Sequence, residues 1–130
     1  MGANLGYFSC LAAKAVGPGG VVHAVEPAPV NVEALERNIR LNELCNVVVH
    51  PVAAADVGGE RTLRLTARDD HHGLYDHPDS PTIAELRVPT TPADALFDAP
   101  ANLIKVDVEG AEVEVPKGMA GLLRRSPVPQ

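Results

Sequence analysis

The stretch Val21-Val22-His23-Ala24-Val25-Glu26-Pro27 decides the fold of this chain. Its first five residues are mostly apolar and rich in β-branched side chains, which is typical of a short parallel strand buried on both faces. The strand ends at a carboxylate that is followed by a proline. We therefore expect Glu26 to lie at the carboxyl end of a buried strand.

Helical patterns lie on both sides of this strand. From Gly6 onward, apolar residues recur at helical spacing until a Gly-Pro-Gly-Gly run ends the pattern; these residues are Phe8, Leu11, Ala12 and Ala15. After the strand, Pro29 suits the first turn of a second helix, in which Val32, Leu35 and Ile39 share one face. The central strand is thus expected to sit between two helices.

Two further apolar runs, residues 47–50 and 103–108, are predicted to be buried strands. The second of them ends in the acidic residues Asp107 and Glu109. Strand and helix alternate along the chain, which predicts an α/β fold with right-handed parallel crossovers. In such a sheet the ligand crevice lies at the carboxyl ends of the strands.

The segment between these two strands has a different pattern. Residues 61–66 and 85–88 alternate apolar with polar side chains, which predicts an antiparallel, half-exposed insertion. Residues 67–82 between them are polar, and we expect a mobile surface loop. Thr91 is predicted to cap a helix that has Pro92 in its first turn.

Composition excludes several classes of protein. The formal net charge of −6 and the low aromatic content of 3% disfavour broad nucleic-acid binding. No apolar run is long enough to cross a bilayer and no secretory signal is present, so we expect a cytoplasmic protein. Cys10 and Cys45 form no CxxC pair and are expected to be reduced. We expect one domain over residues 1–130, and the sequence does not indicate an oligomeric state.

A glycine loop and an acid suggest a nucleoside ligand. Residues 2–6 read Gly-Ala-Asn-Leu-Gly before the first helix, and Glu26 ends the following strand, where a carboxylate can accept hydrogen bonds from ribose hydroxyls. The alternative is a tight turn into the helix with an exposed acid. Among nucleoside ligands, dinucleotides need a closer G-x-G-x-x-G turn, so the G-x-x-x-G spacing favours S-adenosylmethionine.

The chain resembles the FkbM-type S-adenosylmethionine-dependent methyltransferases over nearly its whole length. The matching stretches are residues 2–8, residues 23–27 and, most specifically, Leu103-Ile104-Lys105-Val106-Asp107-Val108-Glu109-Gly110-Ala111-Glu112. The resemblance implies a class I Rossmann-like sheet with helices on both faces. It also implies that Gly2, Asn4 and Gly6 line the methionine and ribose end of the cofactor, that Glu26 holds the ribose hydroxyls, and that Ala54 and Asp56 lie near the adenine.

Methyl transfer needs positioning of the acceptor and one base to take its proton. Asp107 and Glu109 are the candidates for that role, at the crevice end of their strand. The alternative is that Glu109 and Glu112 only favour the N-terminus of the next helix. Lys105 is expected to pair nearby. The resemblance implies O-methylation of a small-molecule or sugar hydroxyl, without nucleic-acid or membrane partners.

The chain departs from the family pattern at both ends. Members of the family carry a strand before the glycine loop and further strands after residues 122–125, so we expect an incomplete sheet, with its first and last strands missing. Pro116 falls where a helix is expected and should kink or restart it. A second hypothesis is therefore a truncated, non-catalytic remnant that binds a nucleoside or a partner chain. An NAD-dependent oxidoreductase is disfavoured by the glycine spacing.

The remaining candidates are histidines. Residues 69–79 contain several Asp and His side chains, but without a recognised ligand spacing we expect a solvated loop and no metal site. His23 and His50 lie inside predicted strands and are expected to be core histidines.

Overall fold

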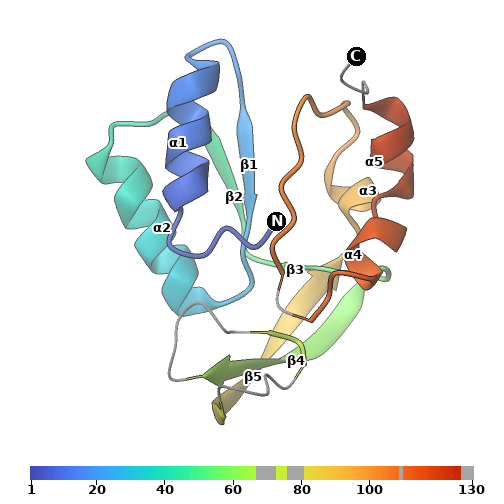
Figure 1. Ribbon diagram of the computed structural model, residues 1–130. Coiled ribbons are helices and arrows are strands. Elements are labelled where there is room, and N and C mark those ends of the chain that lie inside the picture. The colour runs from blue at the N-terminus through green and yellow to red at the C-terminus, as the bar shows by residue number, and fades with distance from the viewer. Residues whose placement is uncertain (67–72, 76–80, 109, 127–130) are drawn as a thin grey trace.

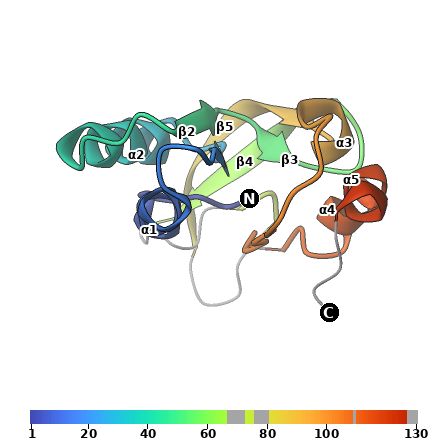
Figure 2. The ribbon, with the colours of Figure 1, turned by 90° about the horizontal axis from the view of Figure 1, so that it is seen from above.

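The computed structural model describes residues 1–66, 73–75, 81–108 and 110–126. Helices α1 (Tyr7–Val16) and α2 (Pro29–Leu41) lie on one side of the molecule, next to strands β1 (Val22–Val25) and β2 (Val47–His50). Three short helices lie on the opposite side, α3 (Ala93–Leu96), α4 (Glu114–Lys117) and α5 (Ala120–Arg125) (Figure 1). Strands β3 (Ala53–Ala54), β4 (Gly59–Thr66) and β5 (Thr82–Thr91) complete the fold. Figure 2, the view from above, separates the same two groups of helices.

The strands form two small sheets in the described part of the chain. β1 and β2 pair in parallel, with Val22 opposite Val47 and Val25 opposite His50. In the second sheet the order is β3-β5-β4, and the β4–β5 pair is antiparallel. The predicted strand and helix at residues 21–41 and the antiparallel insertion are therefore confirmed. The insertion is longer than expected, because its strands begin at Gly59 and end at Thr91.

Residues 103–108 differ from the expectation of a buried strand. They run beside β1 with the N-terminal residue between the two segments (Figure 1), and in the described residues they belong to neither sheet. Their side chains still alternate, since Ile104, Val106 and Val108 pack against the core whereas Leu103 is 85% exposed. Backbone pairing is what the segment lacks. Among residues distant in the chain, only Met1 pairs with the backbone of this segment in the described part of the structure. Its N-terminal amine donates to the oxygen of Lys105 at 2.7 Å, and its oxygen accepts from the N–H of Asp107 at 3.2 Å.

Helix α1 buries a different face from the one expected. Its fully buried residues are Ser9 and Ala13, whereas Phe8 and Leu11 are each 55% exposed. The buried positions of α1 therefore carry small side chains, and these two large apolar residues lie outside. Helix α2 follows the prediction better, because Leu35 is fully buried and Pro29 occupies its first turn.

Two other local predictions have mixed outcomes. Thr91 is the last residue of β5 and does not cap α3, whose N-cap is Pro92 without a side-chain hydrogen bond. The predicted break at Pro116 is confirmed, since the helical segment stops after Lys117 and restarts at Ala120.

Two apolar clusters hold these elements together. The larger cluster joins the end of β1 and β3 to the three C-terminal helices; its buried members are Val25, Ala54, Ala93, Ala111, Val115, Met119 and Leu122. The smaller cluster, formed by Ala28, Ala53, Leu63 and Val88, lies under the β4–β5 hairpin. Leu74 packs against both clusters. The end of β1, the end of β3 and the segment after residues 103–108 therefore meet in the larger cluster, through Val25, Ala54 and Ala111.

Candidate functional site

The glycine loop at residues 2–6 folds over the end of β1. The N–H groups of Gly2 and Ala3 both donate to the oxygen of Val25 at 3.0 Å. Gly2 has φ +73°, and a Cβ built on it would lie 1.8 Å from the oxygen of Asp107. The loop can therefore pass between β1 and Asp107 only because residue 2 lacks a side chain.

Gly6 and Asn4 also adopt left-handed backbone conformations. Gly6 is the N-cap of α1 with φ +91°, and a Cβ there would lie 2.4 Å from Cδ1 of Leu35. Asn4 has φ +50°, and its side-chain oxygen accepts a 2.6 Å hydrogen bond from the N–H of Leu5. Backbone conformation and close contacts therefore explain why glycines occupy positions 2 and 6. The loop is thus fixed in place beside the end of β1.

Glu26 is the buried acid that this loop meets. Glu26 is only 5% exposed. Oε2 accepts from the N–H of Asn4 at 2.8 Å, and Oε1 accepts from the N–H of Ala28 at 3.1 Å and from Nδ2 of Asn31 at 3.3 Å. A buried carboxylate held by several donors is a polar group in a defined orientation. The alternative of an exposed acid at the strand end is therefore wrong.

Asp107 lies next to the glycine loop, as the Gly2 contact requires. Its carboxylate is exposed and pairs with Nζ of Lys105 at 2.8 Å. The ammonium of Lys105 also lies 4.7 Å from the ring centroid of Phe8. The expectation that Lys105 pairs nearby is confirmed. Asp107 is thus a solvent-accessible carboxylate at the edge of the loop, whereas Glu109 lies outside the described residues.

The segment after Glu109 turns sharply into α4. Gly110 has φ +80°, and its N–H donates to Oε1 of Glu112 at 3.2 Å. Glu112 precedes the first residue of α4, Glu114. The carboxylate of Glu112 therefore binds the turn before the helix. Gly110 in that turn has a left-handed conformation, which glycine adopts without strain.

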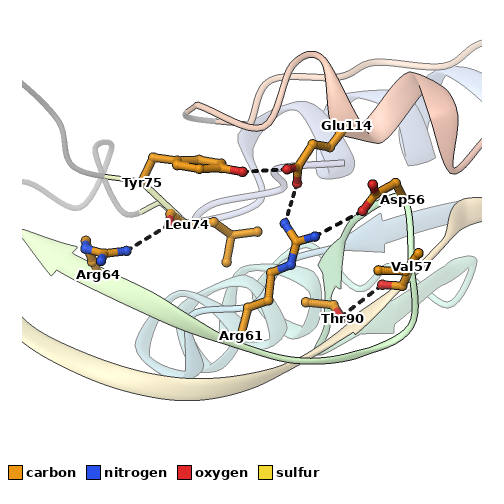
Figure 3. A network of polar contacts seen from close by, with 8 residues as sticks. All are labelled: Asp56, Val57, Arg61, Arg64, Leu74, Tyr75, Thr90 and Glu114. Atoms are coloured by element: carbon orange, nitrogen blue, oxygen red, sulfur yellow. Dashed lines mark hydrogen bonds and ion pairs between the residues drawn. The ribbon is translucent and has the colours of Figure 1, made fainter.

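Asp56 lies in an ion-pair network that the sequence did not predict (Figure 3). Nη2 of Arg61 donates to Oδ1 of Asp56 at 3.0 Å, and Nη1 donates to Oε2 of Glu114. The hydroxyl of Tyr75 donates to the other oxygen of Glu114 at 2.5 Å. The members come from the turn between β3 and β4, from β4, from α4 and from the segment between β4 and β5, so no short motif could have indicated them. Ala54, the other expected adenine neighbour, is 5% exposed and part of the larger core cluster.

The network shifts the acidity of its members. The hydrogen bond from Tyr75, followed by that from Arg61, lowers the pKa of Glu114. The hydrogen bond to Glu114 raises the pKa of Tyr75 and also that of Arg61. These directions describe an ionised carboxylate held between a guanidinium and a neutral phenol.

His23 and His50 are not core histidines. His23 is exposed and His50 half-buried, and Nδ1 of the first lies 2.9 Å from Nε2 of the second. The ring of Phe97 contacts both imidazoles, with centroids 5.0 and 5.4 Å away. Burial and the charge of His23 lower the pKa of His50.

The expectations about metals, thiols and membranes have separate outcomes. The Asp and His side chains of residues 69–72 and 76–79 lie outside the described residues, and no group of three metal-ligating side chains occurs in the described ones. Cys10 and Cys45 are free thiols, as expected. Among the described helices none is long and apolar enough to span a membrane. Where the polar stretch is described, at residues 73–75, Gly73 exchanges hydrogen bonds of 2.8 and 3.1 Å with Arg64.

Comparisons with known proteins give three likenesses. The model of the methyltransferase FkbM domain matches residues 1–128. Methyltransferase 1 of Beauveria bassiana is 29% identical over 140 residues, covering 91% of this chain and 56% of that protein. The crystal structure of methyltransferase FkbM from Methylobacillus flagellatus has 24% identity and a TM-score of 0.62, and the match covers 94% of this chain and 28% of that one. The chain therefore spans little more than half of the first protein, and its likeness to the second is one of fold.

Proposed function

The chain belongs to the FkbM methyltransferase domain family, and from this premise we propose that it binds S-adenosylmethionine and directs its methyl group to a hydroxyl oxygen of a small molecule or sugar. The observation that carries the proposal is the contact between the glycine loop and Glu26, made by the 2.8 Å hydrogen bond from Asn4. A buried carboxylate beside a glycine loop is the donor and acceptor set that an adenosine ribose requires.

The residues present fit such a cofactor chemically. Glu26 would accept hydrogen bonds from the ribose hydroxyls, and the loop of residues 2–6 would border the methionine end. Asp56, with its second oxygen directed away from Arg61, would lie toward the adenine. When bound, the sulfonium supplies an electrophilic methyl group, so the protein needs only to align the acceptor and receive its proton.

Asp107 is the candidate for receiving that proton. Its carboxylate is exposed and held by Lys105 beside the glycine loop. The carboxylate would orient the acceptor hydroxyl and take up its proton as the oxygen gains the methyl group, which the cofactor would supply. Glu109 is the second candidate by sequence alone.

Calorimetric titration with S-adenosylhomocysteine tests the proposal. We expect binding by the folded chain, a loss of at least tenfold in affinity in Glu26→Gln, and no change in Glu36→Gln, which alters an exposed acid on α2. Circular dichroism verifies that each variant is folded. A folded chain that gives no binding signal would exclude this function.

A second candidate is a domain that binds a nucleoside without turnover. It is favoured by the backbone contacts between β1 and residues 103–108: Gly2 and Ala3 bond to Val25, Met1 bonds to Lys105 and Asp107, and no strand pairs with both segments in the described residues. Binding of S-adenosylhomocysteine without methyl transfer to any of a panel of hydroxylated small molecules would support this candidate.

A further inference from the structure

Two segments of the candidate site are joined by one side chain. The first is the turn Ala54–Asp56, which begins at the last residue of β3, and the second is the segment Gly110–Glu114, which ends at the first residue of α4. The guanidinium of Arg61 donates to Asp56 in the first and to Glu114 in the second (Figure 3). Planar guanidinium groups suit this task because their donors form a rigid fork.

The ion pairs of Arg61 are more protected than an ordinary surface pair. The side chains of Arg61, Asp56 and Glu114 are 29%, 31% and 22% exposed. On the same hairpin, Arg87 and Glu60 are 64% and 66% exposed and 3.5 Å apart. Reduced exposure strengthens electrostatic attraction, so the bridge of Arg61 constrains its partners more than the pair of Arg87 does.

Other contacts hold the elements next to these two segments in place. A Cβ at Gly118, the C-cap of α4, would lie 2.0 Å from the oxygen of Ala55, so the backbones touch there. Tyr75 lies on the other side of Gly110, where a Cβ would be 3.1 Å from the ring. The hydroxyl of Tyr75 binds Glu114. These contacts place α4 against Ala55 and Tyr75 against the segment Gly110–Glu114, and Arg61 links Asp56 directly to Glu114.

We propose that Arg61 is a positioning residue for cofactor binding, which holds the turn Ala54–Asp56 and the segment Gly110–Glu114 at the spacing that the bound adenosine requires. The inference rests on the proposed function. Arg61 acts through Asp56 and Glu114 and does not need to touch the ligand. Without it, the carboxylates of Asp56 and Glu114 would lose the guanidinium that binds both of them, and the spacing would widen before a ligand binds. Loss of this preorganisation lowers affinity.

The experiment measures S-adenosylhomocysteine affinity by calorimetry in the full chain and four variants. We expect Arg61→Ala to bind about tenfold more weakly, Arg61→Lys to recover part of that loss, and Glu114→Gln to bind roughly threefold more weakly. Arg87→Ala removes a matched arginine from the same hairpin and should bind like the unaltered chain. Glu114→Gln removes the charge of one partner with almost no change in side-chain volume, so weaker binding by this variant separates positioning from simple loss of packing.

The outcomes distinguish the two proposals. If the unaltered chain binds and Arg61→Ala binds within a factor of two of it, the positioning role is wrong while the proposed function stands. If Arg61→Ala does not fold, Arg61→Lys and Glu114→Gln decide, and unchanged affinity in both overturns the inference. If the unaltered folded chain does not bind, the proposed function fails and the role of Arg61 with it.

Discussion

The N–H of Asn4 lies 2.8 Å from Oε2 of Glu26, so the glycine loop and the acid at the end of β1 are one structural unit. The two residues are separated by a helix and a strand in the chain. Asn4 itself has a left-handed backbone conformation, with φ +50°. A change in the loop should therefore alter the position of the Glu26 carboxylate as well as the packing of α1.

Gly2→Ala should destabilise the protein. The added methyl group would lie 1.8 Å from the oxygen of Asp107, at a φ of +73° that alanine rarely adopts. Both effects cost free energy, and we expect the free energy of unfolding to fall by about 2 kcal/mol or more, measured by urea denaturation. Gly19→Ala is the control, because a Cβ there meets nothing within 4 Å. Equal stability of the two variants would contradict the contact.

Asp94 should make the stability of the C-terminal helices dependent on pH. The N–H of Gly121, with that of Leu122 and the charges of Arg125 and Arg124, holds the pKa of Asp94 below its usual value of 3.8. A folded-state pKa below the unfolded one means that the stabilisation is complete above the unfolded pKa and is lost as the pH falls through the folded pKa. Thermal melting between neutral pH and acid should show a steeper decline in the unaltered chain than in Asp94→Asn, whose amide does not titrate. Parallel curves would show that Asp94 contributes nothing.

Much of the N-terminal half could be predicted from the sequence, because local patterns decide it. The β-branched run at residues 21–25 and the proline at residue 29 specify a strand and a helix start, and both are observed. The prediction of which face of α1 is buried was wrong, for a physical reason. Periodicity identifies a helix with an apolar stripe, but tertiary packing decides which face is buried, and here it buries the small Ser9 and Ala13 and leaves the larger Phe8 and Leu11 exposed.

The network around Arg61 could not be predicted. Arg61 and Glu114 are 53 positions apart, and neither belongs to a spaced motif. Residues 103–108 also show that local sequence does not determine contacts between distant segments. Their composition is that of a buried strand, but a strand needs partners along its whole length, and in the described residues only Met1 provides them. Pairing is a tertiary property that composition does not encode.

His50 should lower stability as the pH falls below neutral. Burial and the neighbouring His23 lower the pKa of His50 from its usual value of 6.5, so the unfolded chain binds more protons than the folded one in that window. The free energy of unfolding is therefore highest above the unfolded pKa and declines as the pH falls through the folded pKa. We expect His50→Gln to show a shallower decline in urea denaturation at matched pH values. An identical pH dependence in the variant would show that the imidazole pair is not the cause.

Tyr75 provides a spectroscopic test of the Arg61 network, because Tyr7 is the other tyrosine of the two in the chain. In a Tyr7→Phe background, alkaline titration of the phenolate absorbance reports on Tyr75 alone. Its hydrogen bond to Glu114 raises the pKa above the usual 10.0, since ionisation would place two negative charges together.

Two further variants in this background assign the causes. Glu114→Gln should bring the titration midpoint of Tyr75 back toward 10.0, because the neighbouring carboxylate is removed. Arg61→Ala should move it further upward, since the guanidinium charge lowers this pKa. Circular dichroism at each pH verifies that the protein remains folded. A midpoint that stays the same in both variants would mean that Tyr75 is not held by Glu114 in solution, and the contacts that fix the segment Gly110–Glu114 would then be fewer than the structure shows.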